Sequence, residues 1–270
     1  MAVIAAAPAT RTTGLGPSTT QIAYRTLLRY MRTPQLIVLG TIQGAMFLLI
    51  FRYVFGGAIP IKGGIPYVDF LVPGFITTGV LFTGMNAASG AAEDLQQGFV
   101  DRLRSLPVPR LCFLTGRAIA DTAWNTWGLI VTAALGFAIG FRIHGPVLDS
   151  LAAFGLCVVF GFAFEWLFIM LGLMAGTPQA AQGMALLVFP FTFVSSAYIP
   201  VSSMPGWMQA FASQQPVTYM VDAVRSLSQG HAAELLIGHS TGYLVVGSLL
   251  WALGFVVVFA PLAALRYKHS

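Results

Sequence analysis

EDLQQGFVDRLRSLPVPR, the stretch from Glu93 to Arg110, interrupts a chain that is otherwise almost uniformly apolar. It carries three acidic residues, three arginines and two prolines. Over all 270 residues, 57% are hydrophobic and only 9% are charged, whereas soluble domains carry roughly a quarter charged residues. The sequence therefore predicts an all-α integral membrane protein that crosses the bilayer several times.

Six stretches around this passage fit a membrane-spanning helix, which needs about 20 apolar residues. They lie at Gln35–Phe55, Asp69–Ala92, Cys112–Phe141, Ser150–Gly176, Met184–Pro200 and Thr241–Leu265. The fifth is short and contains Pro190. Dropping it would place the basic C-terminus outside the cell, so the charge pattern favours six spans.

The orientation follows from the basic residues, because cytoplasmic flanks are enriched in Lys and Arg. One side receives Arg11, Arg25, Arg29, Arg32, Arg102, Arg104, Arg110, Arg117, Arg266 and Lys268. The other side receives only Arg52, Lys62, Arg142 and Arg225. The sequence thus predicts a multi-pass protein of the cell membrane with both termini in the cytoplasm.

The segment before the first span predicts a tail and a surface helix. Residues 1–20 lack a basic region ahead of their short apolar run, so they are interpreted as a flexible cytoplasmic tail, and residues 21–270 as one transmembrane domain. In QIAYRTLLRYMRTP, apolar residues recur at helical spacing at Tyr24, Leu27, Leu28 and Met31. This favours an amphipathic helix in the membrane interface over a basic cluster that only sets topology.

Several function classes are excluded by missing motifs. A P-loop needs a Gly-Lys pair, but Lys62 follows Ile61 and Lys268 follows Tyr267. The four histidines and two cysteines show no metal-ligand spacing, and neither a nucleophile elbow nor a paired-carboxylate site is present. We therefore expect no enzyme activity, no cofactor and no metal. The net charge of +5 comes from arginines at the ends of apolar runs and indicates no nucleic-acid partner.

The charged passage itself predicts a short amphipathic helix beneath the membrane. After Gly98, the apolar residues Phe99, Leu103 and Leu106 fall on one face, at i, i+4 and i+7. The charged residues Asp101, Arg102 and Arg104 back this stripe. A loop that only satisfies the positive-inside rule explains the arginines but not the stripe, so we expect a helix that docks on a cytoplasmic partner.

At these residues the chain resembles the type-2 permease subunits of ATP-binding cassette exporters, particularly those of the daunorubicin-resistance type. The resemblance rests on EDLQQGFVDRLRSLPVPR and on YIPVSSMPGWMQAFASQQPVTYMVDAVRSL, from Tyr198 to Leu227. It implies an interfacial helix, six spans, a coupling helix after span two and an extracellular insertion before span six, which we expect to be a re-entrant helical hairpin. It also implies a dimer of permeases, identical or sister chains, on separate ATPase subunits that bind the ATP and Mg²⁺.

A substrate path is expected between the spans. In the resembled family spans two and five border the pathway, which implies roles for Thr77, Thr78, Asn86, Phe189, Phe193, Ser195 and Ser196. Glu165 is a lone carboxylate near the middle of span four. It would act as a counter-charge for a cationic substrate or as a conformational latch, or else be a protonated carboxyl or the structural partner of an arginine on another helix. Arg117 and Asp121, at i and i+4, are expected to form a pair that contributes little beyond orientation.

The alternatives are a secondary transporter or channel of the cytoplasmic membrane, or a membrane enzyme. A channel or secondary transporter would not need the docking helix, and its inverted repeats are not visible here. A membrane enzyme would need clustered acids or histidines at one interface. The exported molecule is expected to be hydrophobic or amphipathic, with drug, lipid and polysaccharide all left open.

Overall fold

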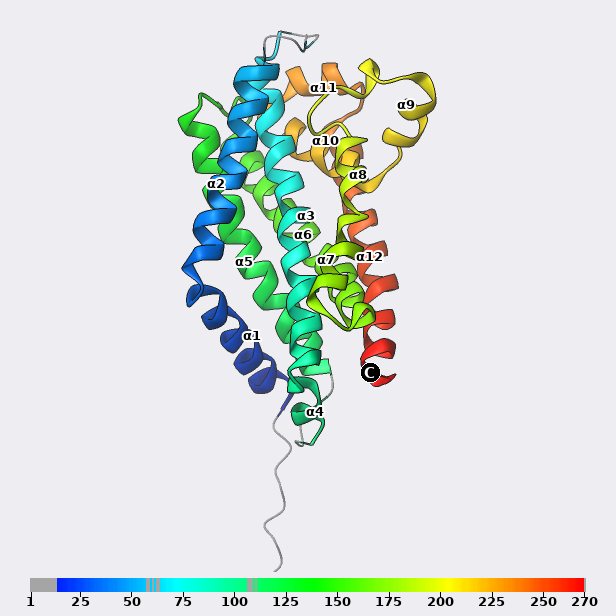
Figure 1. Cartoon of the computed structure of the whole chain (residues 1–270). Coiled ribbons are helices and arrows are strands. Elements are labelled where there is room, and N and C mark those ends of the chain that lie inside the picture. The colour runs from blue at the N-terminus through cyan, green and yellow to red at the C-terminus, as the bar shows by residue number, and fades with distance from the viewer. Residues whose placement is uncertain are drawn as a thin grey trace, which may run out of the picture.

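The computed structural model describes residues 14–56, 59, 61, 64–105, 109 and 111–269, and within them every regular element is a helix (Figure 1). In chain order these are α1 (Leu15–Met31), α2 (Pro34–Ile50), the π-helix η1 (Phe51–Phe55), α3 (Tyr67–Gln96), α4 (Phe99–Arg104), α5 (Leu111–Ala138), α6 (Val147–Ala175), α7 (Pro178–Leu186), α8 (Phe189–Phe193), the 3-10 turn η2 (Val201–Ser203), α9 (Gly206–Ala212), α10 (Pro216–Gln229), α11 (His231–Ile237) and α12 (Thr241–His269). The prediction of an all-α chain is confirmed for the described residues.

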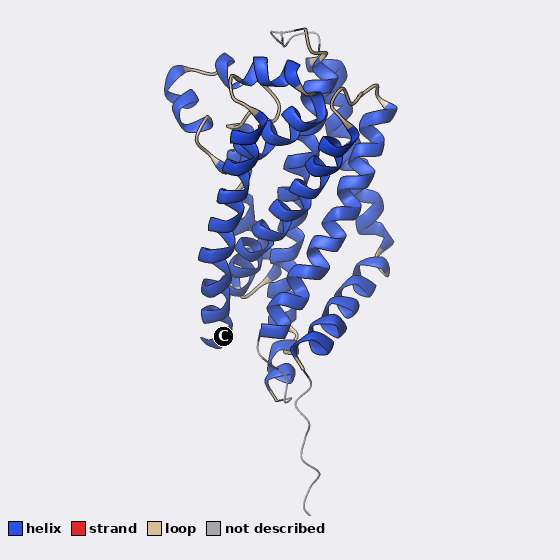
Figure 2. Ribbon diagram, turned by 180° about the vertical axis from the view of Figure 1, so that it is seen from behind, coloured by secondary structure: helices blue, strands red, loops and turns tan. Residues whose placement is uncertain are grey.

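The long helices form one elongated bundle. The helix α6 packs against both α3 and α12, and α5 packs against α3 and α1. Figure 1 shows α1, α4 and the end of α12 at one end of this bundle, with α9, α10 and α11 at the other. The view from behind in Figure 2 shows the same division, with the C-terminus at the end opposite α9, α10 and α11.

Close contact between α3 and α6 depends on glycine. A Cβ on Gly172 would lie 2.3 Å from the carbonyl oxygen of Ala88, and one on Gly84 would lie 2.1 Å from the ring of Phe168. A side chain at Gly172 would have to displace the backbone of α3, and one at Gly84 would have to displace the buried ring of Phe168. Small residues of this kind let membrane helices approach closely and gain packing energy.

Three of the described helices, α3, α6 and α12, are long and apolar enough to cross a membrane, and Gly40–Phe55 is a shorter apolar helix. The helix α5 is as long as these but is not among them, because it carries Arg117, Asp121 and several other polar residues. The apolar helices make the chain an integral membrane protein.

Five of the predicted spans coincide with helices to within a few residues, namely α2 with η1, α3, α5, α6 and α12. The fifth prediction, Met184–Pro200, is wrong as a single helix. The chain instead forms α7 and α8, with the helix interrupted at Leu187 and Val188 and followed by turns after Phe193. Pro190 causes the interruption because it cannot donate a backbone hydrogen bond. The start at Pro178, capped by the Thr177 hydroxyl, lies six residues earlier than expected.

The expected helix before the first span is present as α1, and it begins at Leu15, so residues 15–20 are helical where a flexible tail was predicted. In the predicted apolar stripe Tyr24 and Met31 are exposed and Leu27 and Leu28 are half-buried, and the place of this helix in the membrane interface stays a prediction. The opposite face, which includes Ile22, Ala23 and Thr26, is buried on the bundle. One face of α1 therefore packs on the bundle, and the other face is exposed.

Candidate coupling region and membrane cavity

The predicted docking helix is α4, which starts after Gly98 in the left-handed conformation at φ 66°. A residue with a Cβ rarely adopts this φ, so the glycine permits the sharp turn out of α3. The observed helix ends at Arg104, two residues before the predicted end. Leu106 lies outside the described residues, as does the side chain of Arg104.

The apolar stripe of α4 faces its own chain more than the sequence suggests. Val100 is fully buried, and Phe99 and Leu103 are half-buried against a cluster that includes Phe113 and Tyr267. The guanidinium of Arg25 lies 3.7 Å from the centre of the Phe99 ring. Asp101 and Arg102 are exposed at the end of the molecule. The exposed side of α4 is thus its charged side, with Asp101 and Arg102.

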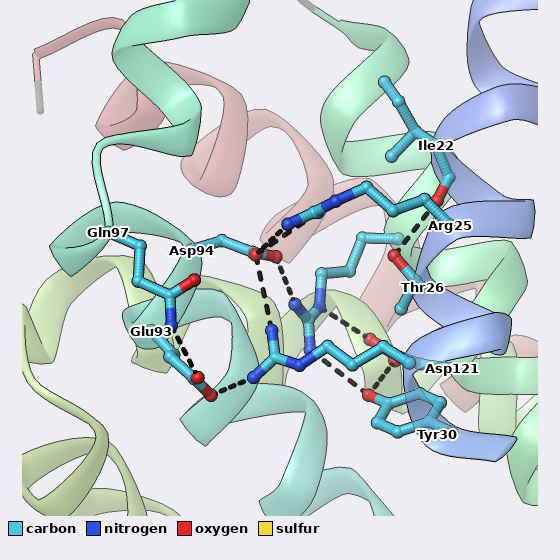
Figure 3. Close-up of polar contacts among 10 residues, drawn as sticks. Ile22, Arg25, Thr26, Tyr30, Glu93, Asp94, Gln97 and Asp121 are labelled. Carbon is cyan, nitrogen blue, oxygen red and sulfur yellow. Dashed lines mark hydrogen bonds and ion pairs between the residues drawn. The ribbon is translucent and has the colours of Figure 1, made fainter. Parts of the chain in front are cut away.

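Beside α4, a buried guanidinium joins α1, α3 and α5. Arg117 Nη1 donates a hydrogen bond to Asp94 Oδ2 at 2.6 Å, and Nε donates to Asp121 Oδ2 at 3.1 Å. Its Nη2 donates to the hydroxyl of Tyr30 at 3.2 Å, and Tyr30 donates to Asp121 Oδ1 at 2.6 Å (Figure 3). The expected pair of Arg117 and Asp121 is confirmed, and it belongs to a contact among three helices that the local spacing did not predict.

A second, more exposed layer surrounds this core. Arg25 and Arg29 of α1 both approach Asp94 Oδ1, at 3.4 Å and 3.5 Å, and Arg29 also pairs with Glu93 (Figure 3). We call the whole set the charge cluster: Arg25, Arg29, Tyr30, Glu93, Asp94, Arg117 and Asp121. Its three arginines balance its three carboxylates, which offsets the cost of burying the central ions.

Local features hold the charge cluster in place. A Cβ on Gly90 would lie 2.1 Å from Arg117 Nη2, so the glycine makes room for the guanidinium. Burial and the neighbouring Asp121 carboxylate raise the pKa of the Tyr30 hydroxyl. Tyr30 therefore stays a neutral donor at physiological pH, and it stacks on Trp124 with ring centres 5.2 Å apart.

Glu165 of α6 lies within electrostatic range of the charge cluster. It is 1% exposed, it lies in the field of Asp121 and Arg117, and its Oε2 atom has no hydrogen-bond partner among the described residues. No ion pair joins Glu165 to an arginine in the part of the chain that the structure describes, so both its role toward a substrate and its structural role stay predictions.

A second buried arginine lies at the opposite end of the bundle. Arg225 of α10 donates from Nε to the backbone oxygen of Phe70 at 3.1 Å, from Nη2 to that of Ser196 at 2.8 Å, and from Nη1 to Asp222 Oδ1 at 2.7 Å. Its guanidinium also lies 3.7 Å from the centre of the Phe70 ring. Both Asp222 and Arg225 are buried, and their contacts hold α10 against α3 and the turn after α8.

Between these two ends lies a cavity of about 400 Å³, walled by α2, η1, α3, α5, α7 and α8. Its lining combines aromatic rings, including Phe82, Trp124, Trp127 and Tyr198, with amide side chains. Phe82 and Phe189 meet edge to face with centres 5.0 Å apart, and Tyr198 stacks on Phe51 at 4.8 Å. Apolar walls with a few convergent polar groups are typical of small-molecule sites.

The predicted path residues divide into two sets. Asn86, Phe189 and Phe193 line the cavity. Thr77, Thr78, Glu165, Ser195 and Ser196 are buried and are not in its lining. The hydroxyls of Thr77 and Thr78 bond backbone oxygens one turn back in α3, and Thr78 also meets the Tyr198 hydroxyl at 3.1 Å. Ser195 donates to the Thr192 oxygen.

Sequence reasoning missed several residues of both sites. The partners of Arg117 in α1 and α3 are 87 and 23 residues away, so no local pattern joins them. Glu93 and Asp94 could have been found, because two acidic residues follow the second apolar stretch. Arg25 and Arg29, which are four residues apart before the first stretch, are suitable partners on the same side of the membrane. In the cavity, Gln43, Asn125 and Gln182 could have been found as amides inside apolar stretches.

Known proteins are similar to this sequence over most of its length. Residues 18–228 match the ABC-2 type transporter family. The chain is 30% identical to the daunorubicin resistance ABC transporter permease protein DrrB1 of Streptomyces coeruleorubidus, over 96% of this chain and 89% of the relative. It is 25% identical to the probable doxorubicin resistance permease DrrC of Mycobacterium tuberculosis H37Rv (91% and 86% covered), and 26% identical to the inner membrane transport permease YadH of Escherichia coli K12 (73% and 77%). The chain is therefore a member of the ABC-2 type transporter family, a family of membrane permease subunits.

Proposed function

We propose that the chain is the permease subunit of an exporter for hydrophobic or amphipathic molecules, drugs or lipid-like compounds, driven by ATP hydrolysed on a separate subunit. Relatives named for daunorubicin and doxorubicin resistance support a drug as cargo. A second permease, identical or sister, completes the transporter, and membrane lipids surround it. The cavity supplies the binding site through Asn86, Phe189 and Phe193.

The proposed topology has six spans and cytoplasmic termini. The spans are α2 with η1, α3, α5, α6, the broken pair α7–α8, and α12. The basic residues of α1 and α4 lie at the same end of the bundle as the end of α12 (Figure 1), which supports a cytoplasmic assignment for that end. The segment α9–α11 then forms the extracellular hairpin, with Trp207 76% exposed as an interfacial anchor.

The observation that carries the coupling role is the connection of α4 to the rest of the molecule. The helix presents Asp101 and Arg102 outward, while Arg25 of α1 covers Phe99 and pairs with Asp94 of α3. A push on α4 from a docked ATPase would therefore reach α1, α3 and α5 through the charge cluster. The proposed contact surface comprises Phe99, Asp101, Arg102, Leu103, Arg104 and Leu106.

The test is the charge reversal Arg102→Glu, because Arg102 is exposed and we expect its replacement to leave the bundle folded. We expect roughly tenfold weaker association with the ATPase subunit, since a reversed charge at an interface repels the partner surface. The readout is co-purification from detergent, with the ATPase identified by its mass spectrum, together with ATP-dependent export in proteoliposomes. Arg102→Lys and Arg32→Glu, at another exposed arginine of the same end, are the matched controls.

Retained ATPase and wild-type export in Arg102→Glu would show that α4 is not the coupling contact. Export that continues with no ATPase present would contradict the whole proposal and favour a secondary transporter.

A further inference from the structure

The wall of the cavity is electrically neutral. Among the described residues that line it, none is Asp, Glu, Lys, Arg or His. The contrast is sharpest along α5, where Arg117 and Asp121 belong to the charge cluster and Asn125, one turn further on, lines the cavity. Asp121 is paired with Arg117 and Tyr30, so it offers no unpaired negative charge to the space beyond it.

The polar side chains of the cavity are four amides and the hydroxyls of Thr41, Thr83, Thr132 and Tyr198. Asn125 accepts a hydrogen bond from the Thr83 hydroxyl at 2.7 Å. Gln43, Asn86 and Gln182 line the cavity from three different helices, and their side chains make no hydrogen bond with the described residues. A primary amide both donates and accepts, so these three groups suit uncharged carbonyl, hydroxyl and amide groups on a ligand.

The aromatic side chains favour a ligand with flat rings. Phe82, Phe189, Phe193, Trp124, Trp127 and Tyr198 line the same space. Rings gain from stacked and edge-to-face contacts with other rings beyond the area they bury. An aromatic face also attracts a cation, but that attraction offsets only part of the cost of taking an ammonium group out of water with no counter-charge.

We propose that this cavity selects the uncharged form of ring-containing amphipathic molecules and discriminates against cations. This specificity rests on the proposed export function, and Asn86 is its main determinant, as a free and exposed amide of α3 in the wall. Glu165, the carboxylate that could attract a cation, is buried outside the lining.

The test compares two fluorescent probes with the same dansyl ring and linker, dansylcadaverine, which ends in an amine, and its N-acetylated derivative, which ends in a neutral amide. Each is titrated into the purified full-length chain in nanodiscs at about pH 8, where an alkylamine is protonated and an exposed aspartate is ionised. Dansyl fluorescence rises in apolar surroundings, and empty nanodiscs correct for binding to lipid. We expect the neutral probe to bind about tenfold more tightly or better.

Asn86→Asp, nearly the same in shape, should narrow or reverse this ratio by supplying a counter-charge, while Asn86→Gln, which keeps an amide, should preserve it. Because both probes meet the same lipid in every variant, the change in ratio is free of partition effects. Equal or tighter binding of the cation would overturn the proposal, above all if Glu165→Gln abolished that preference. Absence of binding by both probes would also overturn it. The measurement contains no ATPase, so these outcomes leave the Arg102 docking result standing.

Discussion

Arg117 and Arg225 are both buried, and the guanidinium groups of the two residues find their hydrogen-bond acceptors in different parts of the chain. Arg117 is satisfied by side chains, two carboxylates and a tyrosine, which come from three helices. Arg225 is satisfied mainly by backbone, the carbonyl oxygens of Phe70 and Ser196, with Asp222 on its own helix. Side-chain partners can be exchanged when helices shift, whereas backbone partners cannot. The charge cluster is thus suited to move and the Arg225 site to stay fixed.

The largest effect is expected from Arg225→Met. It leaves Asp222 and two buried carbonyl oxygens without their donor, and losing one partner of a buried ion pair costs about 3–5 kcal/mol of unfolding free energy. Titration with SDS in mixed micelles, followed by tryptophan fluorescence, measures that energy. Adding Asp222→Asn should recover less than half, because the two carbonyls stay unpaired. Full recovery would mean that the site is an ordinary ion pair.

Arg117→Met should cost somewhat less, about 3 kcal/mol. Adding Asp121→Asn to Arg117→Met should restore part of the lost stability. The new amide can still accept the hydrogen bond from Tyr30, and Asp94 still pairs with Arg25 and Arg29. We expect more than half of the stability to return in the same SDS titration. If the double variant is no more stable than the single one, the cluster is as rigid as the Arg225 site and the contrast fails.

The smallest effect is expected from Arg29→Gln, because Arg29 is 34% exposed and water already screens its pairs. Exposed ion pairs contribute about 0–1 kcal/mol, and added salt weakens them further. The difference from wild type should therefore shrink as the NaCl concentration rises. A salt-independent loss as large as that of Arg117→Met would place Arg29 in the core of the cluster.

The sequence predicted helices well where one signal dominates. Long apolar runs identified α3, α6 and α12, and the periodicity with the preceding glycine identified α4, because these depend on neighbours in the chain. It failed at α7 and α8, where an apolar run concealed the interruption before Pro190.

The sites were less accessible than the fold. Asp222 and Arg225 look like a solvated helix face until Phe70 and Ser196, 155 and 29 residues away, are seen to approach the guanidinium. Asn86, Phe189 and Phe193 were named for the path together with Thr77 and Ser195, but from sequence alone the residues that line the cavity could not be separated from those packed inside. Only the tertiary arrangement decides which polar groups face a cavity.

The polar start of α5 has a consequence for how the protein is made. Charged residues oppose the transfer of a helix from the translocon into lipid, and α5 carries both Arg117 and Asp121. Tyr30 and Asp94, which satisfy these charges, lie in α1 and α3 and are synthesised earlier. Both partners of these charges are therefore synthesised before α5. This order allows Arg117 and Asp121 to pair with them as α5 leaves the translocon.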